Sequence, residues 1–276
     1  MKKVWFITGS SSGLGRSLTE AVLAQGNIVV ATARDTHKNI DLQLKYEDQM
    51  LSLTLDVTNE AQIKQVIEET TERLGRIDVL VNNAGFGITG ATEAFTDEQV
   101  RSQYQANLLG PVNICRAVLP HMRTQRSGRI LNISSIGGRI TSVGLSIYQS
   151  AKFGLSGFSE ALAKEVKPLG IKVTAVEPGG IKTNWAGASM GFAKPVEGYE
   201  TTVDTRVEAF KSGHFVPAGD PLKVARVIID MVAHPEPPVH LVLGSDAAGI
   251  LDQVNQSREA EYQQWLPVTL STDSDH

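Results

Sequence analysis

A tyrosine and a lysine four positions apart, Tyr148 and Lys152, could share one chemical task in this 276-residue chain. Residues with this spacing lie on the same face of a helix, about one turn apart. Ser135 lies thirteen residues before Tyr148, directly after a predicted strand. The carboxyl ends of parallel strands are where such sheets bind ligands. A phenol, an ammonium and a hydroxyl that meet there could move a proton to or from a bound oxygen atom.

A glycine-rich turn follows the first predicted strand. It reads Thr8-Gly9-Ser10-Ser11-Ser12-Gly13-Leu14-Gly15 and leads directly into a predicted helix. Glycines permit a tight turn and let backbone N–H groups approach a pyrophosphate, which the positive end of the helix dipole also favours. Glycine and serine also form ordinary strand-to-helix turns, and serine is a good N-cap. The strand before the turn and the helix after it favour the dinucleotide-binding interpretation over the ordinary turn.

The end of the second predicted strand carries Ala33, Arg34 and Asp35. An acid at this place accepts hydrogen bonds from a free ribose 2′-hydroxyl, whereas a guanidinium pairs with a 2′-phosphate. Arg34 therefore favours NADP over NAD. Two alternatives stay open: Asp35 lies about 20 residues after the last glycine, where a ribose-binding acid could lie, and an exposed arginine after a strand is often only solvated.

These residues need a scaffold, and the hydrophobic pattern predicts one of alternating strands and helices. The expected strands are Val4–Thr8, Ile28–Thr32, Leu51–Leu55, Val79–Val81, Arg129–Ile133, Lys172–Val176 and Val239–Leu243. The expected helices are Leu14–Gln25, Glu60–Leu74, Asp97–Met122, Ser146–Val166 and Leu222–Val232. Continuous apolar strands indicate burial on both faces, which is typical of a doubly wound, Rossmann-like α/β fold with a parallel sheet.

No linker, repeat or low-complexity block divides the chain, so a single domain over residues 1–276 is expected. Two segments depart from the alternation. Residues 182–219, rich in Gly, Thr, Ala and Pro, are a candidate substrate lid, and the polar tail 267–276 is expected to fray.

Composition excludes several classes of partner. The formal charge is −4, and the basic residues are scattered rather than grouped into a stripe, which argues against nucleic acid. No apolar run is long enough for a signal peptide core or a membrane span, so we expect a cytoplasmic protein and no membrane partner. The one cysteine, Cys115, is expected to fill a helix interior, and the six histidines show no paired ligand spacing, so no metal is expected.

Taken in order, these motifs resemble the short-chain dehydrogenase/reductase family. The matching residues are TGxxxGxG at Thr8–Gly15, Asp56-Val57, NNAG at Asn82–Gly85, Asn107, Ser135, YxxxK at Tyr148–Lys152, and PGxxxT at Pro178–Thr183. They extend from residue 4 to about 185, and the resemblance fades beyond the candidate lid. The family binds a nicotinamide cofactor and interconverts carbonyls and alcohols. The position of Arg34 resembles that in its NADP-preferring members.

The resemblance assigns expected roles. Catalysis would fall to Asn107, Ser135, Tyr148 and Lys152, and the thirteen-residue offset to the tyrosine selects Ser135 over Ser134. Asn107 would connect Lys152 to solvent through a helix distortion and a bound water. The expected cofactor-binding residues are Gly9, Ser11, Ser12, Gly13, Leu14, Gly15, Arg34, Asp56, Val57, Asn83, Ala84, Gly85, Tyr148, Lys152, Pro178, Gly179, Ile181 and Thr183. The family usually forms homodimers or homotetramers through the helices that here contain Asn107 and Tyr148.

The expected chemistry needs an acidified tyrosine. Hydride addition to a ketone leaves an alkoxide that needs a proton, and a free phenol has a pKa of ~10. A lysine ammonium ~4 Å away interacts by about 4 kcal/mol at an effective dielectric constant near 20. That charge is expected to lower the pKa of Tyr148 by about three pKa units, at about 1.36 kcal/mol each. Ser135 would hold the substrate oxygen, and Lys152 would also donate to the nicotinamide ribose.

The leading hypothesis is therefore an NADPH-dependent reductase of a ketone or aldehyde, reversible to an alcohol dehydrogenase. One alternative is a nicotinamide-binding sensor without turnover, and another is a sugar-nucleotide enzyme of the related extended type, which needs a longer C-terminal substrate domain. The pocket walls are expected from Gly137–Ser146 and the candidate lid. They contain Ile140, Val143, Leu145, Trp185, Met190 and Phe192, which suit an apolar small-molecule substrate, although the same residues could simply pack the loop down.

Overall fold

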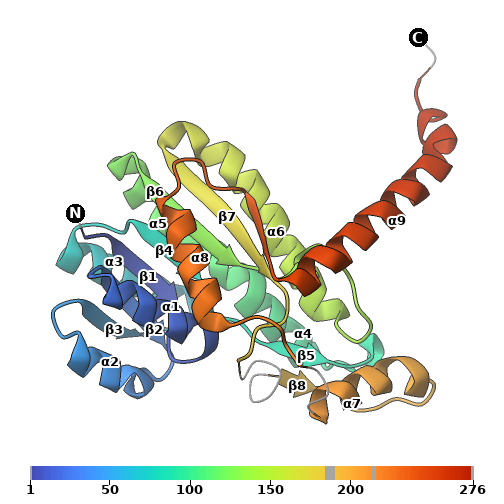
Figure 1. Ribbon diagram of the computed structural model, residues 1–276, viewed down its shortest axis with the longest axis horizontal. Helices are drawn as coiled ribbons and strands as arrows, with labels where there is room; N and C mark the ends of the chain where they lie inside the picture. Colours follow the sequence, from blue (N-terminus) through green and yellow to red (C-terminus); the bar gives the residue numbers. More distant parts are fainter. Residues whose placement is uncertain (1, 184–189, 213–215, 275–276) are drawn as a thin grey trace.

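The structure is a computed structural model that describes residues 2–183, 190–212 and 216–274. A central parallel sheet lies between two layers of helices, and one long C-terminal helix extends away from this body (Figure 1). Trp185, expected in the wall of the substrate pocket, lies outside the described residues.

The sheet confirms the doubly wound α/β class. Within the described part of the chain it has seven strands in the order β3-β2-β1-β4-β6-β7-β9, all paired in parallel. The strands are β1 (Val4–Thr8), β2 (Ile28–Ala33), β3 (Met50–Thr54), β4 (Val79–Asn82), β6 (Gly128–Ile133), β7 (Ile171–Pro178) and β9 (His240–Leu243). The order reverses between β1 and β4, which leaves a crevice at their carboxyl ends of the kind where such sheets bind ligands.

Apolar side chains alternate between the two faces of the sheet and form two cores. Trp5 and Ile7 of β1 pack on one face with α1 (Gly13–Ala24) and α8 (Pro221–Ala233). Phe6, the residue between them, packs on the other face. That second layer contains α3 (Glu60–Leu74), α5 (Gly110–Gln125) and α6 (Ser146–Val166). Cys115 of α5 is fully buried there, as expected.

The helix expected over Asp97–Met122 is not uniform. It begins as α4 (Asp97–Tyr104), changes to a π-helix over Gln105–Leu109, and continues as α5. The wider π-turn places an extra residue in the turn that contains Asn107. The distortion expected at Asn107 is therefore present.

The other differences from expectation lie outside the main sheet. Residues 36–45 form a short 3-10 helix (Thr36–Asn39) and α2 (Ile40–Lys45), which the sequence pattern did not indicate. Two short strands, β5 (Gly87–Thr89) and β8 (Met190–Phe192), pair in parallel, and α7 (Thr205–Lys211) follows within the candidate lid.

The prediction of a frayed tail from residue 267 was wrong over its first residues. Helix α9 (Ser245–Leu270) runs through Pro267, and among its residues only Ala247 is buried. Proline is tolerated so close to the end of an exposed helix because the carbonyl it leaves unpaired can bond to water. No described helix is both long and apolar enough to cross a bilayer.

Candidate active site

The glycine-rich turn lies between β1 and α1, and its glycines are required by the backbone. Gly9 and Gly13 have φ values of +65° and +54°, which favour residues without a Cβ. A Cβ on Gly15 would collide with the carbonyl oxygen of Gly9 and with the side-chain nitrogen Nδ2 of Asn83. Leu14 packs into the core, so only its backbone is available to a ligand. A backbone cradle without side chains fits a pyrophosphate at the start of α1.

The end of β4 is fastened to this turn by Thr8. Its hydroxyl accepts hydrogen bonds from the backbone N–H groups of Asn83 (2.9 Å) and Ala84 (3.0 Å). The Asn83 side-chain amide donates to the carbonyl oxygens of Thr8 (2.9 Å) and Gly9 (3.1 Å). Asn83, expected to contact the cofactor, therefore braces the turn with its side chain. Thr8 is the first residue of the TGxxxGxG motif, but its hydroxyl was not assigned a role from the sequence.

At the end of β2, the two residues that could read the ribose differ in their surroundings. Arg34 is exposed, and its guanidinium has no hydrogen-bond or ion-pair partner among the described residues. Asp35 is the N-cap of the following 3-10 helix, and its carboxylate accepts a hydrogen bond from the N–H of His37 (3.1 Å). A cation that is free to reach a phosphate thus lies next to an acid that is engaged in a local cap.

Asp56 and Val57 follow β3, and each has a local partner. The Asp56 carboxylate accepts hydrogen bonds from the N–H (2.9 Å) and hydroxyl (2.7 Å) of Thr58. Val57 is buried, and a Cβ added to Gly110 would lie 2.7 Å from its carbonyl oxygen. The close approach fixes the loop after β3 against the first turn of α5.

The segment from Pro178 to Thr183 returns toward the glycine-rich turn. The N–H groups of Gly179 and Gly180 donate to the Leu243 carbonyl and the Asp246 carboxylate, each at 2.8 Å. A Cβ added to Gly13 would lie 3.5 Å from Cβ of Thr183. Ile181, which lies in the chain between Gly180 and Thr183, forms an isolated parallel β-bridge with Gly219, the last residue of the candidate lid.

Ser135, Tyr148 and Lys152 come together at the carboxyl end of β6. Ser135 caps a 3-10 turn over Ile136–Gly138, and its hydroxyl is hydrogen bonded to that of Tyr148. Tyr148 and Lys152 lie one turn apart on the buried face of α6. The Lys152 Nζ donates to the carbonyl oxygen of Ile133 at 2.8 Å and lies 5.8 Å from the centre of the Tyr148 ring. Ser134 instead points under the turn, where its hydroxyl contacts the Lys152 carbonyl oxygen at 3.1 Å.

Asn107 faces the same place from the π-helix. Its side-chain nitrogen donates to the carbonyl oxygen of Phe86 (2.8 Å), and its side-chain oxygen accepts from the N–H of Phe86 (3.1 Å). A Cβ added to Gly85 would lie 2.6 Å from the Asn107 oxygen and 3.8 Å from Nζ of Lys152. The glycine of the NNAG motif therefore leaves room for both side chains. The water-mediated link from Asn107 to Lys152 stays a prediction.

The electrostatics of the pair differ from the expectation. Burial raises the pKa of Tyr148 to about 12, and the Ser135 hydrogen bond only partly opposes this effect. Burial also lowers the pKa of Lys152 to about 8. The expected decrease in the Tyr148 pKa was wrong because it considered only the charge of Lys152 and not the loss of water around the phenolate, which raises the pKa.

The expected pocket walls are partly packed inward. Ile140 and Leu145 are buried, and Val143 is exposed. Met190 is buried in β8, with its sulfur 3.1 Å from the Thr89 hydroxyl. Phe192 lies under the Lys211 ammonium, 5.1 Å from ring centre to Nζ. No cluster of three or more potential metal ligands occurs in the described ranges.

Comparison with known proteins agrees with this geometry. The family model for short chain dehydrogenases matches residues 3–190. An oxidoreductase, BOA17, from Botryotinia fuckeliana is 41% identical over 99% of this chain and 100% of its own length. A 3-ketodihydrosphingosine reductase from Bacteroides thetaiotaomicron is 44% identical over 66% of this chain and 65% of its own length. The crystal structure of a short-chain dehydrogenase from Streptomyces avermitilis superimposes with a TM-score of 0.94 at 39% identity, covering 99% of this chain and 100% of that one. The chain therefore belongs to the short-chain dehydrogenase/reductase family, as an NAD(P)-dependent oxidoreductase acting on CH–OH or C=O groups.

Proposed function

We propose that the protein is an NADPH-dependent reductase of a ketone or aldehyde, reversible to a secondary-alcohol dehydrogenase. The observation that carries the proposal is the hydrogen bond between Ser135 and Tyr148, with Lys152 on the same buried face of α6. A proton donor, an oxygen-binding hydroxyl and a cation thus meet at the ligand-binding end of the sheet.

The cofactor preference rests on the end of β2. The glycine-rich turn would hold the pyrophosphate, and the exposed guanidinium of Arg34 is available for the 2′-phosphate of NADP. Asp35 is a weaker candidate for a ribose hydroxyl because it caps the adjacent 3-10 helix. When bound, the nicotinamide supplies a hydride to the carbonyl carbon.

Side chains of the protein bind the substrate carbonyl oxygen and supply the proton that it takes up. The Ser135 hydroxyl donates a hydrogen bond to the carbonyl oxygen of the substrate and polarises the C=O bond. Tyr148, with a pKa near 12, stays a phenol at neutral pH and transfers its proton to the developing alkoxide. The ammonium of Lys152 stabilises the tyrosinate that remains. We assign to Asn107 the role of holding a water molecule through which a proton returns from solvent to Lys152 and the tyrosinate.

The remaining features are part of the same proposal. Residues 1–276 form one domain in which residues 182–219 act as a lid over an apolar substrate. Large apolar side chains in the lid and the adjacent turn that are not fully buried, the exposed Val143 and the partly exposed Phe192, suit that substrate class. Homodimers or homotetramers would use the helices of Asn107 and Tyr148, as the family resemblance implies.

A turnover screen tests the proposal. NADPH oxidation at 340 nm is followed with a panel of apolar ketones and aldehydes, with nucleotide sugars, and without substrate. The proposal expects turnover with at least one carbonyl compound and none without substrate. Binding of NADPH without any turnover would favour a sensor, and turnover of nucleotide sugars alone would favour the extended type of enzyme.

A further inference from the structure

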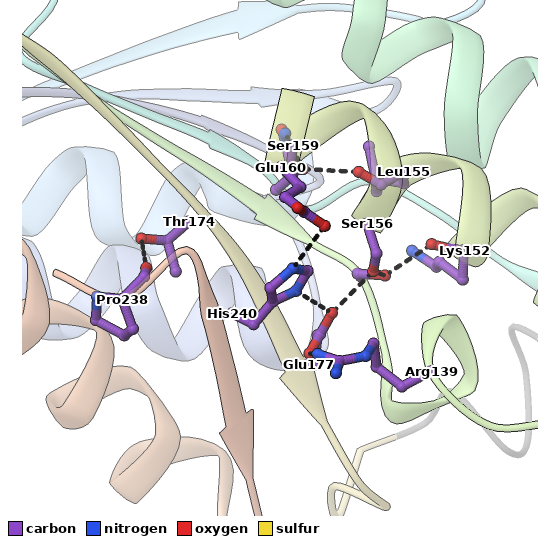
Figure 2. Close-up of polar contacts among 12 residues, drawn as sticks. Arg139, Lys152, Leu155, Ser156, Ser159, Glu160, Thr174, Glu177, Pro238 and His240 are labelled. Atoms are coloured by element: carbon purple, nitrogen blue, oxygen red, sulfur yellow. Dashed lines mark hydrogen bonds and ion pairs between the residues drawn. The ribbon is translucent and has the colours of Figure 1, made fainter. Parts of the chain in front are cut away.

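A fully buried carboxylate, Glu177, lies on β7 behind the candidate active site. Its side chain is 0% exposed, and burying a carboxylate costs free energy unless it is paired and hydrogen bonded. Ser156 donates to Oε1 at 2.9 Å, Nδ1 of His240 lies 2.9 Å from the same oxygen, and Nη1 of Arg139 donates to Oε2 at 3.3 Å. Figure 2 shows the carboxylate between these three side chains.

One arm of this network reaches Lys152. The Ser156 hydroxyl gives its proton to Glu177, so its oxygen can accept from Ser134, whose hydroxyl lies 2.9 Å away. The Ser134 proton is shared with the carbonyl oxygen of Lys152, at 3.1 Å. The carboxylate therefore orients two hydroxyls beneath the helical turn that presents the Lys152 side chain.

The other arm reaches the turn of Ser135. Arg139 directly follows the 3-10 turn that Ser135 caps, and its guanidinium is held by Glu177. A Cβ on Gly138, within that turn, would lie 2.6 Å from the Ser156 oxygen and 2.7 Å from the Ser134 oxygen. The turn is thus packed directly on the hydroxyls that the carboxylate orients. A shift of Arg139 or of either serine side chain would therefore be transmitted to the turn that Ser135 caps.

We infer that Glu177 is a positioning residue for the reaction, because it links the Ser135 turn to the Lys152 segment of α6. In the part of the chain that the structure describes, Glu177 has no hydrogen bond or ion pair with Ser135 or with the Lys152 side chain, and it acts through Arg139, Ser156 and Ser134. Reaction rates depend steeply on the placement of reacting groups, and a displacement of about 1 Å can cost 10²-fold. The inference rests on the proposed function, since it assumes that Ser135 and Lys152 act in turnover.

The test is Glu177→Gln, which keeps the shape of the side chain and an acceptor oxygen for Ser156 but removes the charge that holds Arg139. We expect kcat for carbonyl reduction to fall about 10- to 100-fold. The KM for NADPH is expected to stay within about twofold, because the glycine-rich turn is not part of the network. Glu236→Gln is the matched control. Glu236 pairs at 2.7 Å with Lys172, which lies on β7 like Glu177 but at the end of the strand away from the site. Removal of the Glu236 charge is expected to leave kcat unchanged.

A second variant separates positioning from folding. Ser156→Ala keeps the Glu177–Arg139 pair but breaks the arm to Ser134, and we expect it to lower kcat as well. In the double variant the two losses should not multiply, because both interrupt one network. Rates are expressed per folded molecule, with the folded fraction taken from circular dichroism.

The outcomes distinguish this inference from the function on which it rests. If the native protein reduces a carbonyl compound and both Glu177→Gln and Ser156→Ala keep its kcat, the inference is overturned and the proposed function is not. The same holds if the rate per total protein falls only in proportion to the folded fraction, so that the rate per folded molecule is unchanged. Absence of native turnover with every carbonyl tested would overturn the proposed function and the inference together.

Discussion

The buried ammonium of Lys152 gives a prediction about stability that can be worked out from its pKa. Burial lowers this pKa from an ordinary 10.5 to about 8. Between these two values the unfolded chain binds the proton more tightly than the folded chain, so the folded state gains stability as the pH rises. Each pKa unit corresponds to about 1.4 kcal/mol, so the gain from below pH 8 to pH 10.5 is about 3 kcal/mol.

The perturbation is Lys152→Met, which removes the titrating group and keeps much of the side-chain volume. The free energy of unfolding of native protein and variant is measured by urea denaturation at pH 7.5, 9 and 10.5. We expect the value for native minus variant to increase with pH by about 3 kcal/mol. Any effect of the hydrogen bond to Ile133 on the protonation of Lys152 is already contained in the pKa of the folded state, so it adds no separate pH dependence.

The control is Lys164→Met, whose ammonium is exposed on the same helix and pairs with Glu160. Its difference from the native protein is expected to stay nearly constant over this range, because an exposed ion pair contributes little. A pH-independent difference for Lys152→Met would refute the argument that burial of the ammonium is costly. A difference that decreased with pH would show that the ammonium is stabilised in the fold.

Two further predictions concern the binding of the cofactor. Gly15→Ala forces a Cβ against the backbone of Gly9, so the free energy of unfolding should fall by about 1–3 kcal/mol and NADPH should bind more weakly by fluorescence titration. Gly157→Ala, exposed inside α6 where a Cβ meets nothing within 4 Å, should instead raise the free energy of unfolding by about 0.5–1 kcal/mol and leave NADPH binding unchanged, and equal behaviour of the two variants would contradict the proposed cradle. Arg34→Ala should raise the KM for NADPH about 10- to 100-fold and leave that for NADH unchanged, from the loss of about 1.5–3 kcal/mol in charge-assisted bonds. Arg101→Ala, exposed on α4, is the control, and an equal effect of Arg34→Ala on both cofactors would exclude a contact with the 2′-phosphate.

The main sheet could be predicted from the sequence because its strands are buried on both faces. All five residues of Val4–Thr8 are buried, so the strand reads as a continuous apolar run with a turn directly after it. The small sheet of β5 and β8 could not be predicted in this way. Each of its strands has three residues, and they pair Gly87 with Met190, so no local pattern reveals the partner.

Helix α9 was missed for a different reason. Its apolar residues do not form one stripe, and its side chains are almost all exposed, so the periodicity that marks a packed helix is absent. Pro267 was interpreted as the start of a frayed end, although a proline near the exposed terminus removes few hydrogen bonds.

The candidate site was predicted in part. Spacing and order brought Ser135, Tyr148 and Lys152 together, because the strand end and the helix face fix where they lie. The raised pKa of Tyr148 could not be obtained from spacing, since it depends on how completely the surrounding residues exclude water.

The buried network around Glu177 depends on contacts between residues distant in the chain. Its partners Ser156 and Arg139 are 21 and 38 positions away. One local signal was available: Ser156 is one helical turn after Lys152, and Glu177 directly precedes the Pro178-Gly179 pair.

The replacement Tyr148→Phe examines whether Tyr148 is the proton donor, because it removes one oxygen atom from the candidate site. With the native protein as reference, NADPH affinity is measured by fluorescence titration and turnover by single-wavelength kinetics with an active carbonyl substrate. We expect NADPH affinity to stay within about twofold, while kcat falls by ~10²–10⁴, the usual share of general acid catalysis. A variant that reduced the carbonyl at the native rate would contradict the assignment of Tyr148 as the proton donor.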